Sequence, residues 1–382
     1  MSASSPIDQS MVACIPLRGN GIVRLWSQSV RTPGSFSVRV RAGSRRSHSR
    51  SDVPSEIPSF PSPVEPRSGH RREVRDVGVS VGDTRVHAVV DAVVDYPFPL
   101  ETFYPDVPMD AWDEWRERFP ETFWARDRHT LDYTAYVIRG SERTILLDCG
   151  MGSSVAPMPA FVDTLPTGVM TTHQPHRLLN GLSGMGLAPD DIDVVVLTHL
   201  DVDHVGWAVT ITPEMRFAPT FPKARYVVDL ADWNAYHSPG WDAKTPFDYV
   251  GASVTPLKAL GVLDLVTEDV VLDAGVTFAA ANGHTPGHRI VRVADGGEVA
   301  YLLGDAIVHP AQVTFPDWRN MADADPDAAR RTRRALLDRI EDEGAVMAAT
   351  HFPHPWFGRI VRVDGRRLWK PVSPALGQPA DA

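Results

Sequence analysis

The sequence has few cysteines and no long hydrophobic run. Its 382 residues include two cysteines, Cys14 and Cys149, which lie far apart in the chain. Two such thiols cannot form the disulfide framework that stabilises small secreted domains. No apolar run approaches the ~20 residues that cross a bilayer, and the N-terminus lacks the compact apolar stretch of a secretory signal. We therefore expect a soluble, cytoplasmic protein with no membrane partner.

The sequence also lacks an excess of basic charge. Lysine and arginine total 38 against 48 aspartate and glutamate residues, which leaves a net charge of −10. Nothing in this balance favours a nucleic-acid partner, because nucleic acids attract basic surfaces. The hydrophobic fraction of 43% is ample for a buried core. We therefore expect no nucleic-acid partner.

Residues 1–76 differ in composition from the rest. They are rich in serine, arginine and proline and poor in acidic residues, as in 41–50 and 54–66. Such a stretch cannot bury enough apolar surface to offset the entropy lost on ordering. We interpret it as a disordered extension or as translated sequence upstream of the true start. An organelle transit peptide is the alternative, since those are also rich in arginine and serine. The globular domain is expected at 77–372, followed by a tail at 373–382.

The globular part alternates short β-branched runs with helical segments, which predicts a layered α/β domain. One helix is well marked, because Asp325 can cap it, Pro326 suits its first turn and Gly344 can end it. The run 330–334 on that helix, which contains four arginines and Thr332, is expected to form a solvated face. The predicted strands lie at 86–94, 144–148, 194–198, 225–228, 276–280, 289–293, 299–303 and 346–350.

Residues 96–124 are irregular and carry nine aromatic side chains. One interpretation is the core packing of an awkward loop and helix region. The other is an apolar wall or lid over a substrate pocket. The second interpretation would suit a substrate with an apolar group.

The strongest functional signal is the run 198–206, Thr-His-Leu-Asp-Val-Asp-His-Val-Gly, which directly follows an apolar strand. Open α/β sheets place their ligand sites at such strand ends. Imidazole and carboxylate groups together suit zinc, manganese or iron. The potential metal ligands in the run are His199, Asp201, Asp203 and His204.

Four other strand ends carry residues of the same type. Gly283-His284-Thr285-Pro286-Gly287-His288 is the most distinctive of these segments. A lone histidine is more often structural, but five strand ends that each bear a ligand-type residue indicate one shared site. The residues at these four ends are Asp148, His284, Asp305 and His351.

In these motifs and in their order, residues 77–372 resemble the metallo-β-lactamase superfamily. The resemblance implies a four-layer αβ/βα sandwich with two divalent metal ions at one edge. It implies that Asp305 bridges the two ions and that Asp148 supports the ligand loop from behind. The first ion would be held by His199, Asp201 and His284, and the second by Asp203, His204 and His351.

The segments 198–207, 284–288 and 351–358 look closest to the lactonase and methyl-parathion-hydrolase-like branch. That branch implies hydrolysis of an ester, lactone or phosphotriester by a metal-bridging hydroxide. Asp203 or Asp305 would take up the released proton. His309 is a candidate for holding a substrate oxygen or protonating the leaving group, with a supporting role as the alternative. Cys149 is expected to be a packed residue and His288 a support for the His284 loop.

Asp201 departs from the family pattern, which usually has histidine there. Three carboxylates and a hydroxide would neutralise two divalent ions, so this site is expected to accept manganese or iron more readily than a histidine site. Zinc remains the first expectation. The alternatives are a single bound metal, a non-catalytic homologue, or a metal-dependent oxidoreductase of the same fold. His173 and His176 are expected to be surface residues, and a homodimer is left open.

Overall fold

The structure is a computed structural model. It describes residues 14–17, 21–24, 77–96, 98–152, 171–173, 177–239, 241 and 249–372. The chain divides into two units, Met1–Glu73 and Val74–Ala382. In the first unit, β1 (Cys14–Leu17) and β2 (Gly21–Arg24) pair antiparallel. The rest of the expected extension lies outside the described residues, as do the tail at 373–382 and the side chains of His173 and His176.

The second unit contains two large sheets. In the first sheet, β7, β9, β12 and β13 run parallel, whereas β3, β4, β6 and β7 pair antiparallel. The short strands β5 (Phe123–Ala125) and β8 (Thr171–His173) pair with β6 and β4. Its order is β13 (Leu263–Val266), β12 (Arg225–Asp229), β9 (Val194–Val196), β7 (Thr144–Leu147), β6 (Arg128–Arg139), β4 (Thr84–Asp95) and β3 (Val77–Val81).

The second sheet follows the chain order and is antiparallel except for the parallel pair β17 and β18. A separate hairpin is formed by β10 (Val209–Ile211) and β11 (Phe217–Pro219). The strands of the second sheet are β14 (Val270–Asp273), β15 (Val276–Ala280), β16 (Arg289–Asp295), β17 (Glu298–Leu302), β18 (Val346–Ala348), β19 (Phe357–Val363) and β20 (Arg366–Pro371).

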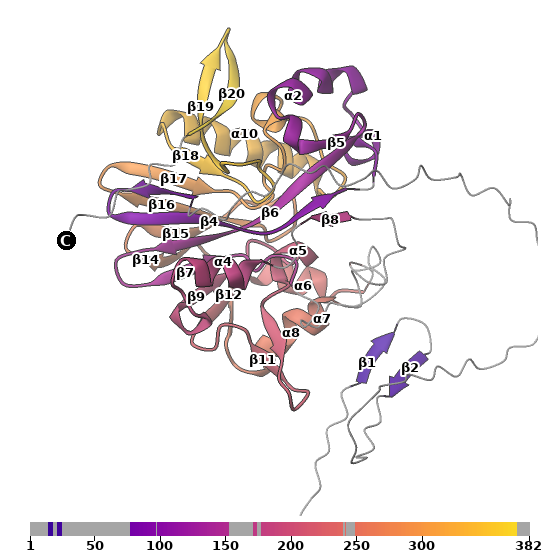
Figure 1. The fold of residues 1–382 in the computed structure, drawn as a ribbon, viewed down its shortest axis with the longest axis vertical. Coiled ribbons are helices and arrows are strands. Elements are labelled where there is room, and N and C mark those ends of the chain that lie inside the picture. The colour runs from indigo at the N-terminus through magenta and orange to yellow at the C-terminus, as the bar shows by residue number, and fades with distance from the viewer. Residues whose placement is uncertain are drawn as a thin grey trace, which may run out of the picture. The chain divides into compact units, whose positions relative to one another are not determined.

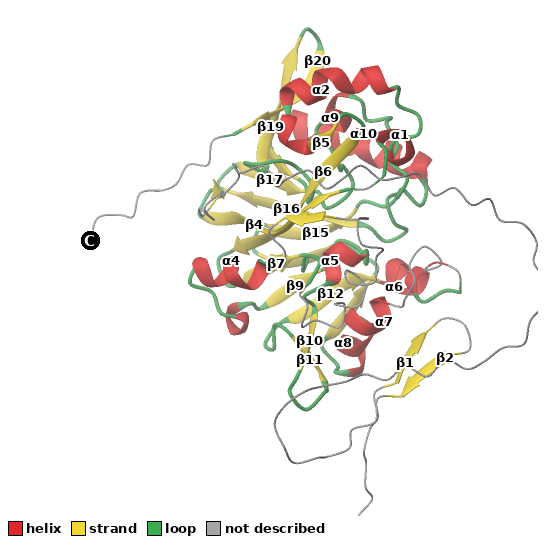
Figure 2. Cartoon of the chain, turned by 45° about the vertical axis from the view of Figure 1, so that its right-hand side comes forward, coloured by secondary structure: helices red, strands yellow, loops and turns green. Residues whose placement is uncertain are grey.

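Helices lie on the outer sides of the two sheets, with the strands in the middle (Figures 1 and 2). One side carries α4 (Leu178–Gly184), α5 (Val202–Val205), α6 (Leu230–Tyr236), α7 (Tyr249–Ser253) and α8 (Thr255–Ala259). The other carries α1 (Leu100–Phe103), α2 (Asp113–Arg118), α9 (Ala311–Thr314) and α10 (Pro326–Asp342). Three 3-10 turns are η1 (Met109–Trp112), η2 (Pro120–Thr122) and η3 (Pro189–Asp191).

Three hydrophobic cores separate four layers. The central core lies between the sheets and joins residues such as Val196 of β9 to Phe278 of β15. A second core packs the first sheet against α4, α7 and α8, and a third packs the second sheet against α10. Successive strand residues alternate between cores, as Val194 and Val196 face the centre while Val195 faces the helices. The predicted αβ/βα sandwich is confirmed.

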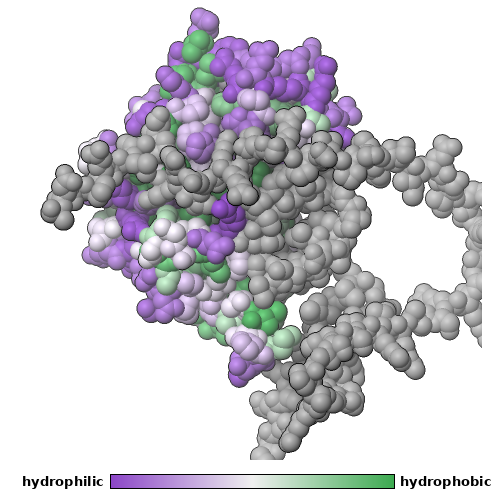
Figure 3. Space-filling view, in the orientation of Figure 1, coloured by the Kyte–Doolittle hydropathy of each residue, from purple (hydrophilic) through white to green (hydrophobic). Residues whose placement is uncertain are grey.

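The predicted local elements are found with small changes of boundary. All eight predicted strands are present, and α10 begins at Pro326, where Asp325 accepts hydrogen bonds from the amides of Asp327 and Ala328. Within the described residues, no helix is long and apolar enough to cross a bilayer. The face in Figure 3 is largely hydrophilic where it is described, with only small hydrophobic areas.

The structure tests one of the two interpretations of the aromatic segment. Trp112 and Trp115 are fully buried in the core that contains α10, so core packing is confirmed for this part. Phe98 and Trp124 are 42% and 44% exposed, and the Trp124 indole donates to the carbonyl of Tyr96. A role of these outer aromatic residues as a pocket wall stays a prediction.

Candidate metal centre

The candidate ligands leave the two sheets at neighbouring strand ends. His199 follows β9, Asp201 stands immediately before α5, and Asp203 and His204 lie in that short helix. The turn is compact because a Cβ at Gly206 would lie 2.0–2.2 Å from the backbone of residues 151 and 152, so only glycine fits there. The second sheet supplies His284 after β15, Asp305 after β17 and His351 after β18.

The first group of ligand atoms consists of His199, Asp201 and His284, which lie within 4.8 Å of one another. Oδ2 of Asp201 is 3.4 Å from Nε2 of His199 and 3.5 Å from Nε2 of His284. These N···O separations suit metal-ligand atoms arranged around a common centre. The group joins the motif after β9 to the loop after β15.

The second group consists of Asp203, His204 and His351, again within 4.8 Å. Oδ2 of Asp203 is 3.8 Å from Nε2 of His204 and 3.5 Å from Nε2 of His351. His204 comes from the first sheet side and His351 from the second, so the fold itself brings this group together.

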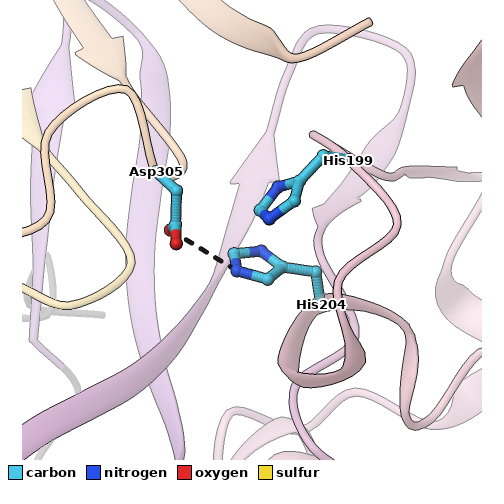
Figure 4. A group of neighbouring side chains, drawn as sticks. All are labelled: His199, His204 and Asp305. Atoms are coloured by element: carbon cyan, nitrogen blue, oxygen red, sulfur yellow. Dashed lines mark ion pairs between the residues drawn. The ribbon is translucent and has the colours of Figure 1, made fainter. Parts of the chain in front are cut away.

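Asp305 lies between the two groups. Its Oδ1 is 3.4 Å from Nε2 of His204, and its Oδ2 is 3.1 Å from Nε2 of His351 and 3.7 Å from Nε2 of His284. Figure 4 shows this carboxylate facing the imidazoles of His199 and His204, with the ion pair to His204 drawn as a dashed line. A carboxylate in this position is suited to bridge two cations.

The outer ring nitrogen of each candidate histidine is held by a protein group. Nδ1 of His204 is 2.8 Å from Oδ2 of Asp148, and Nδ1 of His284 is 3.3 Å from Oδ1 of Asp323. Nδ1 of His199 is 3.0 Å from the Thr198 hydroxyl, and Nδ1 of His351 is 2.8 Å from the carbonyl oxygen of Asp132. If each Nδ1 carries the proton, all four Nε2 atoms present lone pairs to the centre.

Asp148 connects two of these histidines. One of its oxygens accepts from the amide of Thr198, and the other accepts from the Thr198 hydroxyl and faces His204. The hydroxyl in turn lies beside Nδ1 of His199. The structure therefore places Asp148 behind the ligand loop, as the sequence predicted.

The donor set fits divalent metal ions. Nε2 of His199, His204 and His284 and Oδ1 of Asp305 are buried and make no hydrogen bond within the described part of the chain. A buried polar atom without a partner costs free energy, so four of them in neighbouring ligand groups indicate bound cations that would satisfy them. Imidazole nitrogens and carboxylate oxygens are ligands of zinc, manganese and iron.

The electrostatics of the centre favour positive charge. Burial opposes ionisation of Asp305, yet His351 and His204 beside it hold the pKa of its carboxyl well below its usual range. Burial lowers the pKa of His284, but the opposing effects of Asp201, Asp323 and Asp305 raise it to about 10. Protons can supply this positive charge in the free protein, and divalent cations can supply it instead.

Among the described candidate ligands, the two aspartates that follow His199 are the most exposed. The side chains of His199, His204, His284 and His351 are 0–3% exposed, whereas that of Asp201 is 36% exposed and that of Asp203 is 14% exposed. These two carboxylates are therefore the candidate ligands most accessible to solvent.

The structure does not support the predicted catalytic role of His309. Its ring is buried against Trp112 and Trp115, its Nδ1 accepts from the amide of Ala311, and its Nε2 is 3.1 Å from the Thr122 hydroxyl. Burial lowers its pKa to about 3. Both ring nitrogens are engaged by protein groups, which favours the supporting role of His309 over contact with a substrate.

Arg333 corrects the expectation for the arginine run. It is fully buried, donates to the carbonyl oxygens of Ala306, Pro316 and Trp318, and pairs with Asp323 at 3.3 Å. Sequence reasoning missed Asp323 because its link to His284 spans 39 residues. For the buried Arg333, a signal was present in the sequence. Residues 330–334 span more than one full turn of a helix, so at least one of them had to face the core.

The supports of three other ligand segments were also missed. His288 was expected to support the His284 loop, but its Nε2 accepts a hydrogen bond from the amide of Asp305. The Tyr236 hydroxyl donates to Asp201, and the Tyr133 ring packs edge-on against His351 at 5.2 Å between ring centroids.

Cys149 is buried as expected, and burial raises the pKa of its thiol well above the usual value.

A family model, the metallo-beta-lactamase superfamily, matches residues 130–351, which contain all seven candidate ligands. The chain belongs to the metallo-β-lactamase superfamily. The resemblance inferred from the motifs is thereby confirmed. The match begins in β6 and ends at His351, so it includes strands of both sheets but not β3, β4, β19 or β20.

Two curated relatives of the superfamily are lactonases. The N-acyl homoserine lactonase AttM of Azorhizobium caulinodans is 26% identical over 187 residues, which cover 46% of this chain and 64% of that protein. The N-acyl homoserine lactonase AiiA of Bacillus thuringiensis subsp. kurstaki is 23% identical over 223 residues, covering 56% and 79%. The alignment with AttM thus spans less than two thirds of the length of that protein.

Solved structures of the superfamily share the fold. The dizinc quorum-quenching lactonase AidC is 21% identical with a TM-score of 0.62, and 78% of this chain matches 97% of that one. A probable metal-dependent hydrolase from Staphylococcus aureus is 17% identical with a TM-score of 0.63, covering 77% and 99%. At these identities the likeness supports the four-layer fold alone.

Proposed function

We propose that residues 77–372 form a hydrolase that holds two divalent metal ions and cleaves a lactone or a related ester. One observation carries the proposal. Two groups of ligand atoms lie on either side of Asp305, and three buried Nε2 atoms among them have no hydrogen-bond partner within the described residues. His199, Asp201 and His284 would hold one ion, and Asp203, His204 and His351 the other. Such a pair of ions would polarise a carbonyl oxygen and lower the pKa of a bound water.

Zinc is the first candidate because imidazole ligands dominate the centre and AidC is described as a dizinc enzyme. Asp201 adds a third carboxylate to Asp203 and Asp305, which makes the set richer in oxygen. Manganese and iron prefer such oxygen-rich sites more than zinc does. We therefore propose zinc, with manganese or iron as functional replacements.

The residues of the chain position the reactants and handle the proton. Asp203 is partly exposed to solvent, and it would accept the proton released when water attacks a carbonyl carbon. The second candidate is Asp305, whose oxygens contact His204 and His351. The four buried imidazoles, held through Nδ1, supply fixed positions, so little reorganisation is needed during the reaction.

The substrate class follows from the relatives and from the aromatic residues near the centre. AttM and AiiA are named for N-acyl homoserine lactones, which carry an acyl chain. Burial raises the pKa of Tyr96, and the charges of Asp203, Asp201 and Asp305 raise it further. Phe98 and Trp124 are exposed beside it and would contact an apolar acyl or aryl group.

The test is a screen of lactones, aryl esters and phosphotriesters with protein loaded with zinc, manganese or iron. Hydrolysis of a lactone or ester that depends on added metal would support the proposal. An Asp305→Ala variant should lose that activity while remaining folded. Metal binding without hydrolysis of any of the three classes would contradict it, and one ion per chain would favour the single-metal alternative.

A further inference from the structure

The two oxygens of Asp201 have different surroundings. Oδ2 faces the candidate metal ligands His199 and His284 at 3.4 and 3.5 Å. Oδ1 accepts a hydrogen bond of 2.6 Å from the hydroxyl of Tyr236. One oxygen is therefore directed to the centre, and the other is occupied by a buried phenol that is 5% exposed.

Tyr236 is the last residue of α6, and contacts at the start of this helix and within it hold the helix in place. At its start, Asp229 accepts from the amide of Ala231 and from the buried guanidinium of Arg289 at 2.7 Å. On the helix, the fully buried Asp232 accepts from the Thr285 hydroxyl and the Gly287 amide. The same helix therefore reaches Asp201 and the loop that carries His284.

Close packing makes the position of α6 precise. A Cβ at Gly287 would lie 2.6 Å from the amide nitrogen of Asp232 and 2.8 Å from Cβ of Asp229. The loop and the helix are thus in contact along their backbones, which leaves little freedom for α6 to shift. A hydrogen bond from its final residue can hold a carboxylate oxygen in one place.

We propose that Tyr236 is a positioning residue that makes Asp201 a one-oxygen metal ligand and thereby sets the metal preference of the first site. This inference rests on the proposed function, in which His199, Asp201 and His284 hold a metal ion. A free carboxylate can bind through both oxygens and so raise the coordination number. Zinc prefers four ligands, whereas manganese accepts six oxygen-rich ones. Occupying Oδ1 therefore favours zinc at this site.

The test is the Tyr236→Phe variant of the full chain, which removes the hydroxyl and keeps the ring. Its matched control is Tyr226→Phe, because Tyr226 is also fully buried and its hydroxyl also makes one hydrogen bond, from the amide of Phe221. Zinc and manganese affinities are measured by competition with a chelating dye. The visible spectrum of the cobalt-loaded protein reports coordination number, since its intensity falls from four to six ligands.

We expect Tyr236→Phe to bind first-site zinc about 10–100-fold more weakly, as for other residues that orient a metal ligand. The ratio of zinc to manganese affinity should fall and the cobalt spectrum should weaken, while Tyr226→Phe behaves as the parent. An unchanged affinity ratio and cobalt spectrum in Tyr236→Phe would overturn the inference.

If Tyr236→Phe does not fold, a crystal structure of the zinc-loaded parent decides the question. One Asp201 oxygen on the metal and the other on the Tyr236 hydroxyl would support the inference, and an Asp201 with both oxygens on the metal would refute it. A parent protein that binds two ions but hydrolyses nothing contradicts the proposed hydrolysis and leaves this positioning role standing.

Discussion

The carboxylate of Asp305 faces His351 with Oδ2 at 3.1 Å and His204 with Oδ1 at 3.4 Å. The two histidines belong to the same candidate group, and Oδ2 is also 3.7 Å from His284 of the other group. Asp305 is thus the residue on which both groups depend. Its backbone is held as well, because its amide donates to Nε2 of His288.

Replacing Asp305 by alanine should abolish the shared ligand while leaving the cores intact. We expect hydrolysis to fall by more than the roughly 100-fold that losing a supporting residue causes, because this residue would bind the ions directly. Steady-state rates with a lactone substrate measure the effect. Asp317→Ala is the control, since Asp317 pairs with Arg334 at the surface and both side chains are more than half exposed. Equal losses in the two variants would argue against the role of Asp305.

Replacing Asp148 by asparagine should weaken metal binding without removing a ligand. Asp148 accepts from the amide and hydroxyl of Thr198 and faces Nδ1 of His204, so the change disturbs the orientation of the loop. We expect metal affinity about 10–100-fold lower. Chelator competition measures it, with the exposed Asp190→Asn as the comparison. An affinity equal to that of the parent would show that the loop orients itself.

Replacing Asp323 by asparagine should reduce stability strongly. The guanidinium of Arg333 is fully buried and would lose its only carboxylate partner in the described part of the chain. Breaking a buried pair on one side costs roughly 3–5 kcal/mol, because the remaining charge is uncompensated. Urea unfolding of the metal-free protein excludes any contribution from metal binding through His284. A free energy of unfolding within about 1 kcal/mol of the parent, well below the expected loss, would contradict the prediction.

The pKa of His309 predicts a pH dependence of stability. Burial lowers that pKa to about 3 in the folded protein, whereas an unfolded histidine titrates near 6.5. As the pH falls, His309 therefore takes up a proton in the unfolded state before it does so in the folded state. The contribution of His309 to the free energy of unfolding is present above pH ~6.5 and is lost as the pH falls toward 3. His309→Gln cannot titrate, so the parent should lose about 2 kcal/mol relative to this variant between pH 6.5 and 5. Urea unfolding at the two pH values checks this, and a constant difference between the proteins would refute it.

Much of the fold could be predicted because its strands carry a strong local signal. The run 194–197 is apolar throughout, as a central strand buried on both faces must be, and its residues do alternate between two cores. The cap at Asp325 is a local hydrogen bond and was therefore visible in the sequence. The pairing order of the two sheets is not local, and only the family resemblance indicated the four layers.

The candidate ligands could be predicted for the same reason, since each stands at the end of an apolar strand. Their supports could not. Tyr236 is 35 residues from Asp201, and Asp323 is 39 residues from His284, so nothing local marks either pair. His309 looked catalytic because it follows Asp305 closely, but the chain turns it into the aromatic core beside Trp112. The closeness of His309 to Asp305 in the sequence did not indicate in which direction the His309 side chain points.

The most direct measurement is the metal content of the purified chain after dialysis against zinc, determined by elemental analysis. Seven side chains around two centres predict about two zinc ions per chain in the parent and a clear loss in Asp305→Ala. A parent that retains no zinc, or one whose zinc content is unaffected by that substitution, would contradict the account.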